Sequence, residues 1–118
     1  MLKIDLVLSQ NERLLKQNHE LLLGEFKQIQ VIKEAIRRNG EAKQIDIAIE
    51  EMAELTRALI KNRRGFENYE NVVEEIADVE IMMQQLLLIF NCDIDVVNMR
   101  RQKIERLKER LKNEEKSE

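Results

Sequence analysis

The chain has 118 residues, which is the length of one modest domain. Charged residues make up 36% of the sequence and hydrophobic residues 43%, with no Pro and only 3 Gly; this composition favours helices over sheets and excludes a disordered acidic chain. Because 20 basic residues stand against 23 acidic ones, for a formal net charge of -3, no positive surface field is expected to attract nucleic acid.

The first predicted helix is long. Ser9 followed by Glu12 fits a capping box at its start, and the pair Asn39-Gly40 supplies a C-terminal stop. The first ten residues, MLKIDLVLSQ, lack the long apolar stretch of a secretory signal, so a cytoplasmic location is expected. Between start and stop, apolar residues recur at helical spacing at Leu15, Leu22, Phe26, Ile29 and Ile36.

A second helix is predicted from about residue 45 to residue 62, where Arg64 and Gly65 follow as a break. Residues 66–71 show no periodicity and predict a connection between helices. The apolar stripe expected to face the core consists of Ala48, Met52, Leu55 and Leu59.

The third predicted helix, residues 72–90, becomes apolar on almost every face toward its end. Its longest apolar run, residues 86–90, is far shorter than the roughly 20 residues that cross a bilayer, so no membrane span is expected. A helix that is apolar all round must be covered all round, and three amphipathic neighbours can hardly achieve this. The sequence therefore predicts a homo-oligomer with this third helix at its centre.

Asp93 or Asp95 can begin a fourth helix, which ends in a charged tail. Its apolar stripe comprises Val97, Ile104, Leu107 and Leu111. The predicted fold class is therefore all-α, of the four-helix-bundle type. The lone Cys92 comes without the second Cys or the His neighbours of a zinc site.

Two pairs of carboxylates, Glu51 with Glu54 and Glu75 with Asp78, lie at i and i+3 on the second and third predicted helices. Members of such a pair lie about 60° apart and one turn along the helix, so two oxygens can share one cation. Each pair falls beside the apolar stripe of its helix, where an uncompensated carboxylate is costly. A solvated acidic face remains the alternative to a metal site.

Oxygen-only ligands favour Mg²⁺, with Mn²⁺ also possible, over zinc. Since Mg²⁺ usually takes its remaining ligands from water and from substrate phosphates, the expected substrate is a polyphosphate. Glu50 points about 160° from the apolar stripe, which indicates a solvated carboxylate or one that acts from behind the ligands.

The strings AIEEMAELTRALIKNRRG and NVVEEIADVEIMMQQL resemble the MazG-like all-alpha nucleoside triphosphate pyrophosphohydrolases, most of all the small single-domain members of bacteria and phages. The signature of that superfamily is EExxE, a variable gap and then ExxD, here residues 50–54 and 75–78. The resemblance covers about residues 35–111. It implies a MazG-like domain over residues 32–118, preceded by an N-terminal helical extension over residues 1–31.

The resemblance implies hydrolysis between the α and β phosphates of a nucleoside triphosphate, giving a monophosphate and pyrophosphate. By carry-over, Glu51, Glu54, Glu75 and Asp78 would hold the magnesium ions. The general base stays open between Glu50 and Glu54. The implied assembly is a homodimer or homotetramer.

Two further residues are candidates for substrate binding. Lys103 flanks the apolar stripe of the fourth helix and could contact the outer phosphates, although a solvated face of paired charges is the alternative. Gln44 matches a Gln in similar sequences and is expected to help form the nucleotide pocket.

Two other readings stay open. The long, heptad-like first helix and the Leu- and Ile-rich surfaces also fit a non-catalytic helical assembly or adaptor protein. The third possibility keeps the enzyme but restricts its substrate to dUTP or to phosphoribosyl-ATP, as in relatives of the same superfamily.

Overall fold

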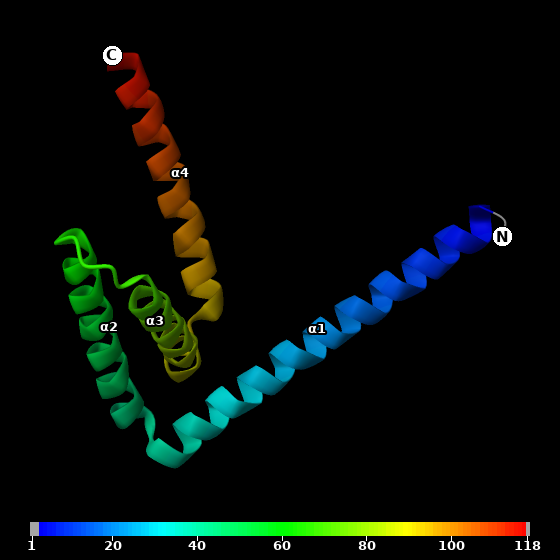
Figure 1. Ribbon diagram of the computed structural model, residues 1–118, viewed down its shortest axis with the longest axis horizontal. Coiled ribbons are helices and arrows are strands. Elements are labelled where there is room, and N and C mark those ends of the chain that lie inside the picture. Colours follow the sequence, from blue (N-terminus) through cyan, green and yellow to red (C-terminus); the bar gives the residue numbers. More distant parts are fainter. Residues whose placement is uncertain (1–2, 118) are drawn as a thin grey trace. The chain divides into compact units, whose positions relative to one another are not determined.

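The computed structural model describes the backbone of residues 3–117 and the side chains of residues 9–116. Within that range the chain is helical, without strands, which confirms the all-α prediction (Figure 1). The helices, in chain order, are α1 (Lys3–Asn39), α2 (Glu41–Arg63), α3 (Tyr69–Ile89) and α4 (Asp93–Ser117).

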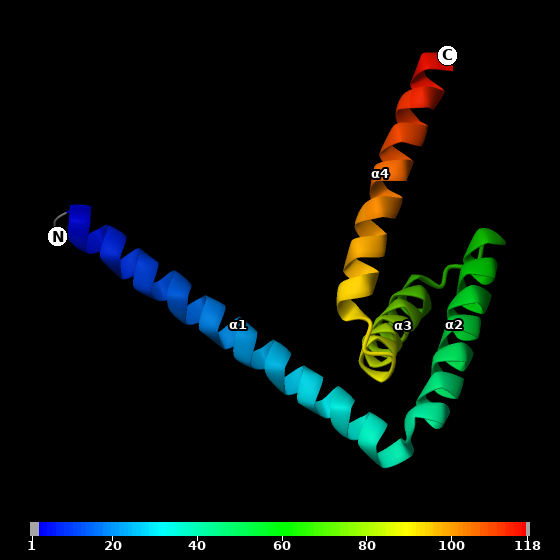
Figure 2. The same cartoon turned by 180° about the vertical axis from the view of Figure 1, so that it is seen from behind.

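The chain divides into two compact units, residues 1–44 and residues 45–118. The first unit holds α1 and the first residues of α2. The second unit holds the rest of α2 together with α3 and α4, and the reverse view in Figure 2 shows α2 and α3 side by side, as Figure 1 does. Because both predicted carboxylate pairs fall within residues 45–118, the second unit contains the candidate site.

The start of α1 differs from the prediction. The helix already begins at Lys3, so Ser9 lies inside it rather than at its N-cap, and the capping-box interpretation is wrong. A capping box needs a non-helical residue ahead of the first turn, whereas helical backbone precedes Ser9 here. The end is as predicted: α1 stops at Asn39, and Gly40 takes a φ of 87°, which glycine adopts without steric cost.

Two tight turns define the ends of α2 and α3. The amides of Gly65 and Phe66 donate to the carbonyls of Asn62 and Lys61, which is a Schellman motif with glycine at the left-handed position, φ 95°. At the end of α3, Asn91 takes the equivalent position with a φ of 48°. α2 begins at Glu41, earlier than predicted, and α3 begins at Tyr69, so the connection expected over residues 66–71 is shorter than the sequence indicated.

The link between α2 and α3 is fixed by Asn68, which precedes α3. Its side-chain amide donates to the main-chain carbonyl of Ala58 at 3.0 Å and lies 3.4 Å from the side-chain oxygen of Asn71. Asn62 in turn donates to the side-chain oxygen of Asn68 at 3.3 Å. Asn68 therefore ties the start of α3 to the body of α2.

We expect Asn68→Ala to lower the free energy of unfolding by about 1 kcal/mol, since it removes the bond to the Ala58 carbonyl. Urea unfolding followed by circular dichroism would measure this change. Asn98→Ala, at an exposed position within α4, is the matched control and should leave the stability unchanged or slightly higher, because alanine favours helix. Equal effects of the two substitutions would contradict the role of Asn68.

The buried face of α2 is rotated from the predicted stripe. Ala48 is buried as expected, but Met52 and Leu59 are exposed, and Ala58 is buried instead. Residues 48, 51, 55 and 58 follow one another at spacings of three or four and so share one face of the helix. This face therefore includes a carboxylate, the half-buried Glu51. The predicted stripe was centred on large side chains, whereas the buried positions of this face include the small Ala48 and Ala58.

The buried face of α3 carries a carboxylate among apolar side chains. Glu75 and Met82 lie on one arc and are both buried, Glu75 with 8% of its surface exposed. Val72, Val79 and Leu86 continue the same arc and are half-buried. Each of the two neighbouring helices therefore carries a carboxylate within its inward face.

Large apolar side chains at the end of α3 stay exposed, among them Ile81, Leu88 and, just after the helix, Phe90. The second unit by itself therefore does not cover the apolar end of α3. None of the described helices combines the length and the apolar character that crossing a membrane would require.

Candidate metal centre

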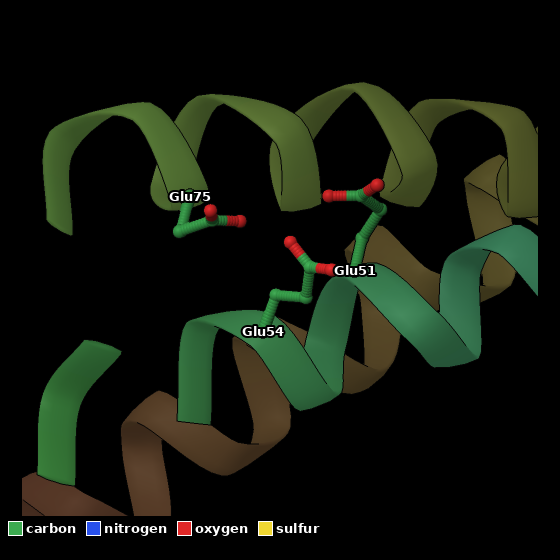
Figure 3. A group of neighbouring side chains, drawn as sticks. All are labelled: Glu51, Glu54 and Glu75. Atoms are coloured by element: carbon green, nitrogen blue, oxygen red, sulfur yellow. The ribbon is translucent and has the colours of Figure 1, made fainter. Parts of the chain in front are cut away.

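Three glutamates meet between α2 and α3. Glu51 and Glu54 project from successive turns of α2, and Glu75 projects toward them from α3 (Figure 3). One carboxylate oxygen from each residue lies within 4.8 Å of an oxygen from each of the others. The i, i+3 spacing on α2 and the hairpin that brings α3 alongside explain why residues 51, 54 and 75 share one place.

The environment of the three carboxylates is uneven. Glu75 is buried, Glu51 is half-buried and Glu54 is exposed. The Oε2 atoms of Glu51 and Glu75 are buried and have no hydrogen-bond partner. Buried oxygen atoms of this kind are costly unless another group compensates them.

The pKa of Glu51 is raised above its usual value of 4.5, first because burial disfavours the charged form. The negative charges of Asp78, Glu54 and Glu75 raise the pKa further, and a side-chain hydrogen bond with Asp78 acts in the same direction. Asp78 is half-buried and therefore belongs to the same electrostatic environment, although it is outside the group of three close oxygens.

The pKa of Glu75 is also raised, again chiefly by burial and then by the charges of Glu54, Asp78 and Glu74. Arg57 is the cation that opposes this rise. The sequence interpretation did not single out Arg57, although its position one turn after Glu54 was a signal that could have identified it. One exposed arginine leaves the pKa of Glu75 raised, so the charge of the cluster stays only partly compensated.

These features fit a divalent cation. The donors are all carboxylate oxygens, which Mg²⁺ and Mn²⁺ prefer, and two of the oxygens lack any other partner. Glu51, Glu54 and Glu75 are the residues that could hold the ion directly, and Asp78 lies near enough to Glu51 to share a hydrogen bond. Because Glu54 is exposed, an ion held by these residues would be open to solvent on one side.

The raised pKa values predict how stability depends on pH. Without divalent cations, the stabilisation from protonated Glu51 and Glu75 is fully present below pH 4.5 and is lost as the pH rises through their raised pKa values. Glu34 acts in a separate window, since Arg37 and Arg38 lower its pKa to about 2. Its contribution is present above pH 4.5 and is lost as the pH falls toward 2.

In a chelating buffer we therefore expect the melting temperature to fall as the pH rises above about 5, where Glu34 is ionised in both the folded and unfolded states. Adding Mg²⁺ should reverse the fall, because the ion stabilises the ionised carboxylates. Thermal unfolding across a pH series, with and without Mg²⁺, would test this. A melting temperature that rises with pH in the chelator would contradict the assignment.

Glu50, one of the two candidates for the general base, is exposed and does not belong to the group of close carboxylate oxygens. Gln44 belongs to the first compact unit, where it is buried and accepts a 3.0 Å hydrogen bond from the side chain of Asn39. Lys103 lies on an exposed face of α4 beside Val96 and Met99. Among the predicted site residues, the group of close oxygens therefore includes the three glutamates 51, 54 and 75.

Comparison with protein-family models, with curated proteins and with solved structures finds no match to this chain.

Proposed function

We propose that the protein is a magnesium-dependent nucleoside triphosphate pyrophosphohydrolase of the MazG-like type, which cleaves between the α and β phosphates. The observation that carries the proposal is the meeting of Glu51, Glu54 and Glu75 from two helices, with two buried oxygens that lack partners. The order of the carboxylates along the chain, EExxE followed by ExxD, supports the same reading.

The burial of each site residue suggests its role. Glu51 and Glu75, whose oxygens face each other between the helices, would hold the cation from its protein side. When bound, Mg²⁺ supplies neutralisation of phosphate oxygens and activation of water as the nucleophile. Arg57, whose charge lowers the pKa of Glu75, adds positive charge at the same site.

Of the two candidates for the general base, Glu54 lies in the cluster and is exposed, so it can accept a proton from an attacking water. Glu50 faces solvent on the same helix and is the second choice. Lys103 and Gln44 remain proposed contacts of the outer phosphates and of the nucleotide.

The proposal extends to assembly and location. A homodimer or homotetramer would cover the apolar residues that the second unit leaves exposed at the end of α3. The cytoplasm, where nucleoside triphosphates are made and used, is the expected location.

The decisive assay incubates the purified chain with Mg²⁺ and a panel of ribo- and deoxynucleoside triphosphates, and measures monophosphate and pyrophosphate directly. We expect both products in equal amounts from at least one nucleotide, with no turnover in a chelator. The panel also ranks dUTP against the others, and phosphoribosyl-ATP is added as a separate substrate. No turnover of any substrate, together with no shift of melting temperature on adding Mg²⁺, would favour the helical adaptor instead.

A further inference from the structure

Helix α4 carries an apolar stripe along one side, and every described side chain of this helix is exposed. The stripe recurs at spacings of seven, three and four residues; its members are Val97, Ile104, Leu107 and Leu111. Two adjoining hollows lie along it, and both are lined by Ile104 and Leu107. The second unit therefore leaves an apolar surface open on α4, which is typical of an interaction site.

The positive charges of α4 gather on the same side of the helix as this stripe. At about 100° per residue, four cations lie within about 90° of its centre: Arg100, Arg101, Lys103 and Lys108. Three of them also line the two hollows. The carboxylates of this stretch, Glu105 and Glu109, both lie more than about 110° from the centre. We call this side of α4, over residues 96–112, the basic face.

The outward side of α3 has the opposite charge. It lies on the far side of the helix from the buried Glu75 and Met82. Exposed residues form a stripe along it, apolar apart from one glutamine: Val73, Ala77, Ile81, Gln84 and Leu88. Three exposed carboxylates lie within about 60° of the centre of this stripe: Glu70, Glu74 and Glu80. Since α3 contains no Lys or Arg, we call this side, over residues 70–88, the acidic face.

The basic face and the acidic face match in length and in charge. At 1.5 Å per residue, the apolar stripe of α4 is about 21 Å long and that of α3 about 22 Å. Among the described side chains, none of the four cations of the basic face forms an ion pair. Both faces belong to the second unit, where both are exposed, so they do not cover each other within one chain.

The other helices do not offer the charge that the basic face requires. α1 contains seven basic and five acidic residues, and α2 contains four basic and five acidic residues. α4 itself contains eight basic and six acidic residues, so the basic faces of two α4 helices would repel each other. α3, with five acidic residues and no basic one, is the complementary surface.

We propose that the basic face of α4 packs on the acidic face of α3 in a second copy of this chain. In a two-fold pair the contact forms twice, because each copy offers both faces. Burial of the two apolar stripes stabilises the contact, and the charges beside them select the partner surface. This inference rests on the homo-oligomer proposed above, and it depends on neither the metal ion nor the proposed activity.

Charge reversal on α4 tests the basic face in the full chain. The variant Arg100→Glu, Lys108→Glu reverses two of its cations, and the control Arg106→Glu, Lys116→Glu makes the same two changes more than about 130° from the centre of the stripe. Light scattering after gel filtration, without nucleotide or divalent cation, should give a lower mass than wild type for the first variant and the wild-type mass for the control. A wild-type mass of 14.0 kDa, or equal masses for the two variants, would overturn the proposal.

Charge reversal on α3 identifies the partner surface. The variant Glu70→Lys, Glu80→Lys should also have a lower mass than wild type, because like charges then meet in the contact. An equal mixture of the α3 variant and the α4 variant should recover the wild-type mass, since the reversed faces attract each other and so do the two unchanged faces. Circular dichroism verifies that both variants remain helical.

Two results of the mixing experiment would overturn the proposal. An unchanged mass for the α3 variant would mean that the basic face meets another surface. A mixture that stays at the lower mass would mean that the two faces do not meet each other. Both results leave nucleotide turnover to be judged by its own assay, so the contact and the activity fail separately.

Discussion

Replacing Glu54 by glutamine is expected to reduce nucleotide turnover at least about 100-fold, because it removes both a ligand oxygen and the better-placed candidate base. The substitution keeps the size of the side chain and leaves its amide in solvent, so the helices should be unaffected. Asp78→Asn should have a comparable effect, since a side-chain hydrogen bond with Asp78 and the negative charge of Asp78 both raise the pKa of Glu51.

The matched control is Glu80→Gln, which makes the same change at an exposed position of α3. Turnover on the best substrate, measured with saturating Mg²⁺, should stay at the wild-type level for this variant. Full activity of Glu54→Gln and Asp78→Asn would remove the site assignment, while equal losses in all three variants would indicate a general effect of acidic charge.

Replacing Glu75 by methionine is expected to raise the melting temperature of the cation-free protein by roughly 5 °C, while turnover is lost. In the wild type, the Oε2 atom of Glu75 is buried without a partner, and burial together with three neighbouring carboxylates raises its pKa. An apolar side chain of similar size removes that unsatisfied atom and can pack on the arc of Met82.

The informative comparison is between chelator and Mg²⁺. The wild type should gain stability on adding the ion, and Glu75→Met should gain little. The difference between their melting temperatures should therefore become smaller or change sign. Glu80→Met, which adds the same side chain at an exposed site of α3, should leave the response to Mg²⁺ intact. A destabilised Glu75→Met in chelator would mean that the carboxylate has a stabilising partner.

Helix ends were predictable where one residue type is required. Gly40 and Gly65 take positive φ angles, which most other residues adopt only with strain. The positions of these glycines in the sequence therefore predicted the ends of α1 and α2 well. Helix starts were less predictable, since many sequences can begin a helix. Ser9 and Glu12 have the spacing of a capping box, yet helical backbone on both sides makes them ordinary helix residues.

The candidate site was more predictable than the packing around it. Glu51, Glu54 and Glu75 were singled out by spacing within each helix, and spacing is preserved wherever the helix lies. Which side of α2 faces inward was not predictable from its large apolar residues, because the buried positions include the small Ala48 and Ala58.

Since the three glutamates are divided between α2 and α3, a divalent ion held by them would link the two helices and offset the repulsion among their carboxylates. Binding of such an ion would then limit local opening of the hairpin. Amide hydrogen exchange near residues 51 and 75 should accelerate when the ion is stripped, whereas amides in the middle of α1 should keep their rates.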